Sequence, residues 1–180
     1  MTGDTAGGRG AAGNLYRVLR IDRAIVDAIV AHARRDHPDE ACGVVAGPAG
    51  SDSPVRFIPM ENAERSQTFY RFDSMEQLRV WREMDDRDEV PVIIYHSHTA
   101  TEAYPSRTDT SLAAEPDAHY VLVSTRDPEQ AEFRSFRIVD GKVAEEPVTI
   151  VEPGVDPHAV QSYMFGQSPT TVVYDCPAGC

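Results

Sequence analysis

A ten-residue run at positions 89–98, EVPVIIYHSH, constrains the fold of this chain more than any other segment. Its centre is apolar without the alternation of a strand that is exposed on one face, so we expect a β-strand covered on both faces. Strands of this kind occur in sheets that have helices packed on either side. The run therefore predicts an α/β fold, with a central mixed sheet flanked by helices. It also places two histidines, His96 and His98, at the end of a buried strand.

Patterns on either side of this run supply the other elements of such a fold. Asp22 is placed to cap a helix over 23–36, and further helices are expected over 74–86 and near 107–114. On the second helix, Met75, Leu78 and Trp81 are expected to form the apolar face. Strands are expected at 15–20, 41–47, 55–60, 119–125, 132–139 and 142–151. The Asp140-Gly141 pair between the last two strands predicts a tight hairpin turn.

Composition limits the classes of partner. The 180 residues carry a formal net charge of −12 at pH 7, which argues against nucleic acid or an anionic membrane as the main partner. No apolar run approaches the ~20 residues of a membrane helix, and three cysteines do not form a disulfide framework. We therefore expect a cytoplasmic protein with reduced cysteines. Residues 1–13 are expected to be a disordered N-terminus, 14–151 a single domain, and 152–180 a C-terminal tail.

The two histidines of the strand are candidate metal ligands. Side chains two positions apart in a strand project from the same face, roughly 6–7 Å apart, so both imidazoles can reach one ion. Asp109 follows on the next turn and helix, and two histidines with one carboxylate leave the open position that is typical of catalytic zinc sites. Imidazole ligands also favour zinc over magnesium or calcium. An alternative is open at this point, because Ser106 and Asp109 have the spacing of a capping box that only starts a helix.

Hydrolysis at such a centre needs a base that accepts a proton from water. Glu40 comes directly before the expected strand at 41–47, where its carboxylate would lie at the sheet edge and partly out of water. From spacing alone, however, the better interpretation of Glu40 is a solvated loop acid, one of 29 acidic residues.

Taken together, Glu40 and the spacing H-x-H-x7-S-x2-D, which is matched here without a gap, resemble the JAMM motif of MPN-domain metalloproteases. The resemblance covers about residues 15–150. It is closest to an actinobacterial branch of cysteine-releasing hydrolases that act on a small ubiquitin-like sulfur carrier protein. The stretches that carry it are DHPDEACGVVAG, FIPMENA, TFYRFDS, EMDDRDE, IIYHSHTATEAYPSRTD, HYVLVSTRD and FRIVDG.

This resemblance implies an MPN-like domain of cytidine-deaminase-like architecture and a set of site roles. His96, His98 and Asp109 would hold Zn²⁺, with water as the fourth ligand. Glu40 would take the proton of that water and pass it to the departing amine, while Ser106 would donate a hydrogen bond to the oxyanion. The implied reaction cleaves a peptide or isopeptide bond at the C-terminal Gly-Gly of the carrier and releases cysteine.

Two alternatives to that reaction are open. One is the trimming of a carrier's C-terminus to expose Gly-Gly for thiocarboxylate formation in a natural-product pathway. The other is a non-catalytic module that binds a ubiquitin-like partner, and the complete motif speaks against it. The sequence also leaves open whether the chain forms a homo-oligomer.

The remaining candidates for chemistry have simpler interpretations. Cys42 is expected to be a small core residue rather than a nucleophile. Cys176 and Cys180 lack the C-x-x-C spacing of a metal or redox pair. The other histidines have no ligand spacing and are expected at the surface or at the edges of elements; they are His32, His37, His119 and His158.

Overall fold

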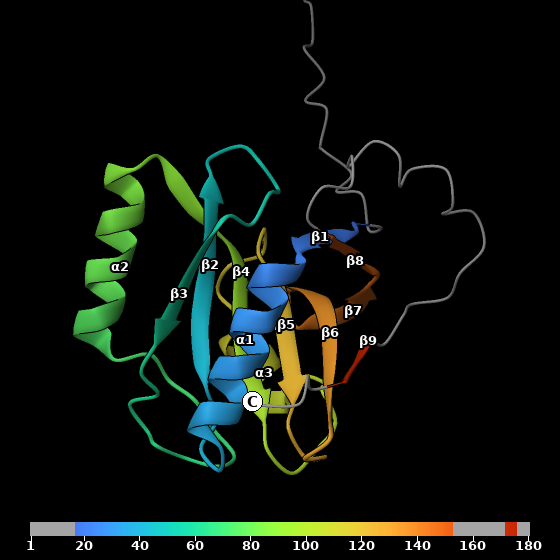
Figure 1. Cartoon of the computed structure of the whole chain (residues 1–180). Helices are drawn as coiled ribbons and strands as arrows, with labels where there is room; N and C mark the ends of the chain where they lie inside the picture. Colours follow the sequence, from blue (N-terminus) through green and yellow to red (C-terminus); the bar gives the residue numbers. More distant parts are fainter. Residues whose placement is uncertain (1–16, 153–171, 176–180) are drawn as a thin grey trace, which may run out of the picture.

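A seven-stranded mixed sheet organises the molecule (Figure 1). The computed structural model describes residues 17–152 and the backbone of 172–175. The helices are α1 (Arg23–Asp36), α2 (Ser74–Asp86) and α3 (Arg107–Leu112). The strands are β1 (Leu19–Asp22), β2 (Cys42–Pro48), β3 (Arg56–Met60), β4 (Glu89–His98), β5 (His119–Ser124), β6 (Gln130–Val139), β7 (Lys142–Glu146), β8 (Val148–Val151) and β9 (Val172–Asp175). The large sheet has the order β3-β2-β4-β5-β6-β7, with β9 also paired to β6, and β1 and β8 form a second sheet.

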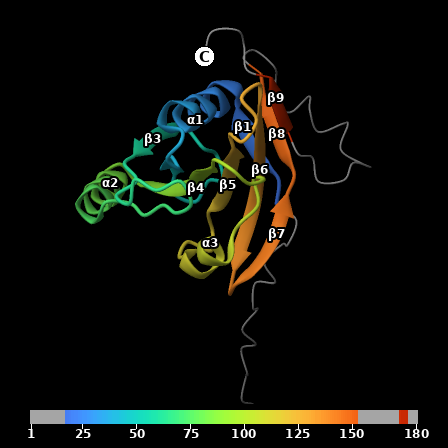
Figure 2. The same cartoon turned by 90° about the horizontal axis from the view of Figure 1, so that it is seen from below.

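The sheet lies between helices, as the uninterrupted apolar run of β4 predicts. β4 is antiparallel to β2 and parallel to β5, so the sheet is mixed. Figure 2 shows α1 on one face of the sheet and α3 on the other. Residues of β4 alternate between these layers, since Ile93 and Tyr95 pack in the core that contains α1, and Ile94 belongs to the opposite core. The predicted α/β class is confirmed.

Helix boundaries follow the sequence closely, but the capping hydrogen bond of α1 is missing and the apolar face of α2 differs from the expected one. Asp22 occupies the N-cap of α1, yet its side chain makes no capping hydrogen bond. Of the expected apolar face of α2, Trp81 packs partly buried against the core, but Met75 is 73% exposed and Leu78 44% exposed; the buried residues are Val80 and Met84. The helix turns Val80 and Met84 inward because they pack against apolar side chains of β2 and β3, a contact that helical spacing cannot reveal.

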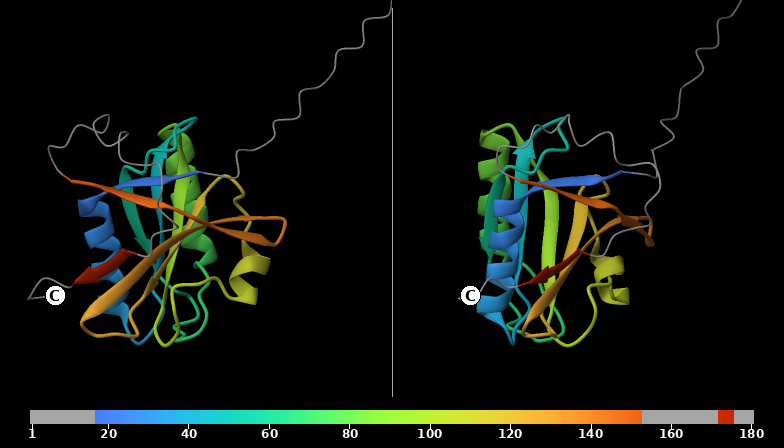
Figure 3. Two further views of the ribbon diagram at one scale, coloured as in Figure 1. Left: turned by 90° about the vertical axis from the view of Figure 1, so that its right-hand side faces the viewer. Right: turned by 45° about the vertical axis from the view of Figure 1, so that its right-hand side comes forward.

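The expected strand at 142–151 is two strands, since Pro147 separates β7 from β8. β7 completes a hairpin with β6, and Asp140 and Gly141 both have positive φ, 50° and 72°, as the predicted turn requires. β8 leaves the large sheet and pairs in parallel with β1. Figure 3 shows this pair running across the direction of β2 and β4.

The region after 151 contributes one further strand that its sequence pattern does not predict. β9 pairs antiparallel with the first half of β6, with Asp175 opposite Gln130 and Val172 opposite Phe133. The expected disordered segment at 1–13 lies outside the described residues. Within the described residues, no helix combines the length and the apolar character needed to cross a membrane.

Candidate metal centre

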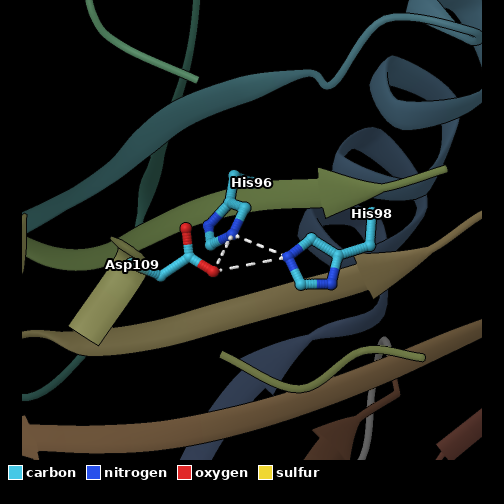
Figure 4. Close-up of side chains that lie close together, drawn as sticks. All are labelled: His96, His98 and Asp109. Carbon is cyan, nitrogen blue, oxygen red and sulfur yellow. Dashed lines mark hydrogen bonds and ion pairs between the residues drawn. The ribbon is translucent and has the colours of Figure 1, made fainter. Parts of the chain in front are cut away.

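His96, His98 and Asp109 meet at the end of β4 (Figure 4). The Nε2 atoms of the two histidines are 3.3 Å apart, and each lies 3.4 Å from Oδ2 of Asp109. Both histidines are buried, and the Asp109 side chain is only 10% exposed. The histidines come from one strand and the carboxylate from the first turn of α3, so the fold closes a triangle whose corners all carry metal-ligand atoms.

The size of this triangle fits a small tetrahedral ion. With zinc–ligand bonds of about 2.0–2.1 Å, the edge of a regular tetrahedron is about 3.3–3.4 Å. The three observed separations, 3.3, 3.4 and 3.4 Å, fall at that value. Two imidazole nitrogens and one carboxylate oxygen are also the ligand types that zinc takes in catalytic sites. The residues present therefore fit the metal that the sequence pattern predicts.

His98 is oriented by the backbone on its far side. Its Nδ1 lies 2.9 Å from the carbonyl oxygen of Glu102 and 3.1 Å from the hydroxyl of Thr101. A carbonyl only accepts hydrogen bonds, so Nδ1 carries the proton, and in the neutral ring Nε2 is the nitrogen that can offer a lone pair to a metal ion. This outer contact holds the ring in the tautomer that a metal ligand needs.

His96 is held by packing instead. The ring of Tyr70 stacks on it with centroids 4.4 Å apart and an interplanar angle of 25°. Its Nδ1 is buried and has no hydrogen-bond partner among the described residues. Sequence reasoning does not single out Tyr70, because a tyrosine 26 positions before the histidine carries no spacing signal. Only the loop that precedes α2 brings it to the site.

Ser106 and Asp109 form the capping box that the sequence allows, and Asp109 also belongs to the metal triangle. The Ser106 side chain accepts a hydrogen bond from the amide of Asp109 at 3.1 Å, and the Ser106 amide donates to Asp109 Oδ2 at 2.7 Å. The two interpretations of the S-x-x-D spacing are thus compatible. The box fixes the rotamer of Asp109, and Oδ2 is the oxygen that faces both histidines.

Charge within the triangle is arranged to keep Asp109 ionised. Burial alone would raise the pKa of its carboxyl, but the hydrogen bonds from His96, His98 and Ser106 outweigh burial and lower that pKa. Burial lowers the pKa of His96. Burial also acts to lower the pKa of His98, but its hydrogen bonds to Asp109 and to the Glu102 carbonyl raise it overall. A metal cation binds to an ionised carboxylate and to a neutral imidazole, and these pKa shifts favour those protonation states for Asp109 and His96.

Glu40 is brought to the same end of the sheet by pairing between β2 and β4. Cys42 lies opposite His96 in the register, and the amide of Ala41 donates to the Ser97 hydroxyl at 2.8 Å. Glu40 is 5% exposed, so it is not the solvated loop acid that spacing alone suggests. Burial raises the pKa of its carboxyl to about 7, while His98 acts to lower it and Asp109 to raise it. None of the described residues donates a hydrogen bond to this carboxylate, which leaves it free to take a proton.

The remaining candidates are structural. Cys42 is fully buried in β2, and burial raises the pKa of its thiol, as expected for a core residue. His37 is exposed as expected, and His158 lies outside the described residues. His119 begins β5, at the edge of an element as expected, but neither it nor His32 lies at the surface, since they are 0% and 3% exposed. Polar partners compensate for their burial: the hydroxyl of Tyr95 and the carboxylate of Asp36 for His32, and the carboxylates of Glu146 and Asp52 for His119.

Comparison with known proteins agrees with this geometry. The family model described as prokaryotic homologs of the JAB domain matches residues 22–139. A Mycobacterium tuberculosis protein named CysO-cysteine peptidase is 74% identical over 140 residues, which cover 78% of this chain and 95% of that protein. A Thermus thermophilus protein named probable TtuB-protein conjugate cleaving protease is 33% identical over 111 residues, covering 60% of this chain and 73% of that one.

A solved structure has the same fold. The solution structure of protein DSY2949 from Desulfitobacterium hafniense superimposes with a TM-score of 0.66 and 31% sequence identity. The match covers 76% of this chain and 94% of the other.

Proposed function

Because this chain belongs to the family of prokaryotic homologs of the JAB domain and is a JAMM-type peptidase, we propose that it releases cysteine from the C-terminal end of a ubiquitin-like sulfur carrier protein. The bond cleaved is the amide between the last glycine of the carrier and the cysteine. The observation that carries this proposal is the 74% identity to CysO-cysteine peptidase over 95% of that protein's length. The Thermus relative, which is named for cleaving a protein conjugate, supports the same substrate class.

In this proposal His96, His98 and Asp109 hold one zinc ion. The ion supplies a Lewis acid that polarises the scissile carbonyl and lowers the pKa of water to about 7. The protein's own contribution begins with geometry, since β4 and the capping box fix the three ligands before any ion binds. Preformed ligands reduce the ordering that binding of the metal would otherwise require.

Glu40 acts as the general base and then as the general acid. Its carboxylate accepts a proton from the attacking water while the bond between the water oxygen and the carbonyl carbon forms. It then delivers this proton to the nitrogen of the departing cysteine when the carbon–nitrogen bond of the amide breaks. A general base works best when its pKa lies near the working pH, and burial moves the pKa of Glu40 to about 7. A bound dication would lower that pKa again, which favours the ionised form that accepts the proton.

Ser106 stabilises the oxyanion. Its hydroxyl oxygen accepts from the Asp109 amide, which leaves the hydroxyl hydrogen free to donate to a substrate oxygen. We expect Ser106→Gly to lower kcat by about 10²–10³-fold, the usual effect of losing one oxyanion donor. Glycine is tolerated at an N-cap at a cost of a few tenths of a kcal/mol, so the helix start and the metal content should be retained. Steady-state kinetics and zinc analysis of the same preparation check this.

The matched control for that experiment is Ser106→Thr, which keeps both the hydroxyl and the capping oxygen. It should retain most of the activity that Ser106→Gly loses. If Ser106→Gly turned over at the rate of the unmodified protein, the hydroxyl would have no role beyond the capping box.

The substrate itself is tested with a carrier that ends in Gly-Gly-Cys. Glycine lacks Cβ, so a Gly-Gly tail can approach a buried metal centre where larger residues would clash. We expect intact-mass spectrometry to record the loss of one cysteine residue and no other change, and a chelator should abolish the reaction. Replacing both glycines by alanine should slow cleavage strongly. Equal cleavage of the alanine carrier, or no cleavage of any Gly-Gly-Cys carrier, would contradict the proposed substrate.

The same measurement separates the alternatives. Removal of several residues that follow Gly-Gly would indicate trimming before thiocarboxylate formation. Tight binding of the carrier without any change of mass would indicate a binding module.

A further inference from the structure

A second concave site lies outside the metal centre and is lined by basic side chains. Its volume is about 630 Å³, and it is formed by the last turn of α1 and the loop between β5 and β6. Three arginines and a histidine line it: Arg34, Arg35, His37 and Arg126. Among the described residues that line it, none is acidic. In a chain with a net charge of −12, three arginines at one pocket are a local concentration of positive charge.

Of the three arginines of this pocket, Arg34 is the one without a carboxylate partner among the described residues. Arg35 is paired with Asp36 at 2.9 Å, and Arg126 with Glu132 at 3.4 Å. Among the described residues, Arg34 has no carboxylate partner, and its Nη1 makes only a 3.4 Å contact with the carbonyl oxygen of Thr125. Its Nε and Nη2 atoms are buried without any hydrogen bond. Buried guanidinium donors without acceptors are costly, and a carboxylate would satisfy them in the bidentate geometry that arginine favours.

Thr125 connects this pocket to the rim of the metal centre. Its amide donates to the carbonyl oxygen of His98 at 2.9 Å, and its hydroxyl lies 3.1 Å from Nδ1 of His37. It directly follows Ser124, the β5 residue that pairs with His98. The pocket therefore lies on the α1 side of the sheet end whose opposite side carries the metal ligands. A folded substrate that sends its C-terminal tail to the metal can therefore reach this pocket from the same end of the sheet.

Resting on the proposed function, we propose that this basic pocket binds an acidic side chain on the folded body of the carrier protein. A carboxylate presented by the carrier supplies the acceptor that Arg34 lacks, and Arg126, whose side chain is 52% exposed, offers a further guanidinium in the same pocket. The pocket is also much wider than an inorganic ion needs, so a side chain brought in by a larger partner fills it better. Elsewhere the acidic surface repels such a partner, and this contrast orients the carrier on approach.

The test compares two substrates that share the same tail. One is the intact carrier–cysteine adduct, and the other is a short peptide with the carrier's C-terminal sequence ending in Gly-Gly-Cys. We expect Arg34→Gln to lower kcat/KM for the intact adduct by about tenfold or more, mainly through KM. Arg126→Gln should show a smaller loss in the same direction, and it serves as the second variant because its side chain is 52% exposed. For the peptide, kcat/KM should change little in either variant.

Arg79→Gln is the matched control, since it removes the same charge from an exposed position on α2. It should leave kcat/KM for both substrates unchanged. Salt should raise KM for the intact adduct and not for the peptide, because screening weakens a charge contact between two proteins.

Two results would overturn the proposal while leaving the proposed function intact. One is a wild-type kcat/KM for the intact adduct in both arginine variants. The other is inhibition by sulfate that is equal for the two substrates and absent in Arg34→Gln, which would assign the pocket to a free oxyanion. If the unmodified protein cleaved neither substrate, the proposed function would fail, and the carrier contact would fail with it.

Discussion

Glu40→Gln is expected to keep its zinc and to lose activity by roughly 10²–10⁴-fold, the usual contribution of a general acid–base group. Glutamine has nearly the size of glutamate, and Glu40 is not one of the three ligand residues, so metal binding should be unaffected. The side chain can no longer accept the proton of water, so the effect should appear in kcat rather than in KM. Single-turnover kinetics with the carrier adduct, together with zinc analysis, measure both quantities.

The same substitution should also change stability, and in a direction set by pH. Burial raises the folded-state pKa of Glu40 from the usual 4.5 to about 7, so the folded protein disfavours the ionised carboxylate. In metal-free protein this penalty is absent well below pH 4.5 and fully present above about pH 7. Metal-free Glu40→Gln should therefore melt at a higher temperature than metal-free wild type at pH 8, and the difference should shrink as the pH falls. Activity gained at the cost of stability is a common feature of catalytic residues.

Glu61→Gln is the control for both measurements, because Glu61 lines the same surface pocket as Glu40 but is itself exposed. It should retain activity and show no gain in melting temperature. A wild-type rate in Glu40→Gln would exclude Glu40 as the base.

Substitution of a metal ligand should have the largest effect of all. His96→Ala and Asp109→Ala each leave two of three protein ligands, so we expect zinc content to fall from about one per chain to near zero. Activity should fall to background, because the polarising charge is lost together with the geometry. Metal analysis after dialysis against a weak chelator gives the direct readout.

Asp109→Asn separates the two roles of this residue. The amide oxygen can still accept the hydrogen bond from the Ser106 amide, which is 2.7 Å long in the capping box, but the anionic ligand is gone. The variant should therefore fold with α3 intact and bind zinc weakly. Asp117→Ala, which removes an exposed acid after α3, should bind zinc normally. Full zinc retention in both His96→Ala and Asp109→Ala would mean that the ion binds elsewhere.

The sequence predicts best the features that depend on neighbours in the chain. The H-x-H pair needs only strand geometry, and the S-x-x-D pair needs only the first turn of a helix, so both appear in the structure as their spacing indicates. The turn at Asp140 and Gly141 is equally local. In each case a few adjacent dihedral angles decide the outcome.

Features that depend on the packing of distant segments are predicted less well. The inward face of α2 is set by contact with β2 and β3, so Val80 and Met84 are buried in place of Met75 and Leu78. The burial of His119 depends on Glu146, 27 residues further along the chain, and on Asp52, 67 residues before it. The burial of Glu40 also depends on distant segments, because the β2–β4 register brings it to the end of the sheet. Its spacing in the sequence does not predict this burial, and only the resemblance singles the residue out.

The strand β9 has a consequence for any shortened form of the chain. β7 covers the outer edge of β6 only from Ser135 to Val139, and β9 pairs with Gln130 to Phe133. A chain cut after Val151 would leave without a strand partner the backbone N–H and C=O groups of that segment that face away from β5. An open strand edge accepts a strand from another molecule as readily as its own, so removal of the C-terminal region would favour self-association and aggregation.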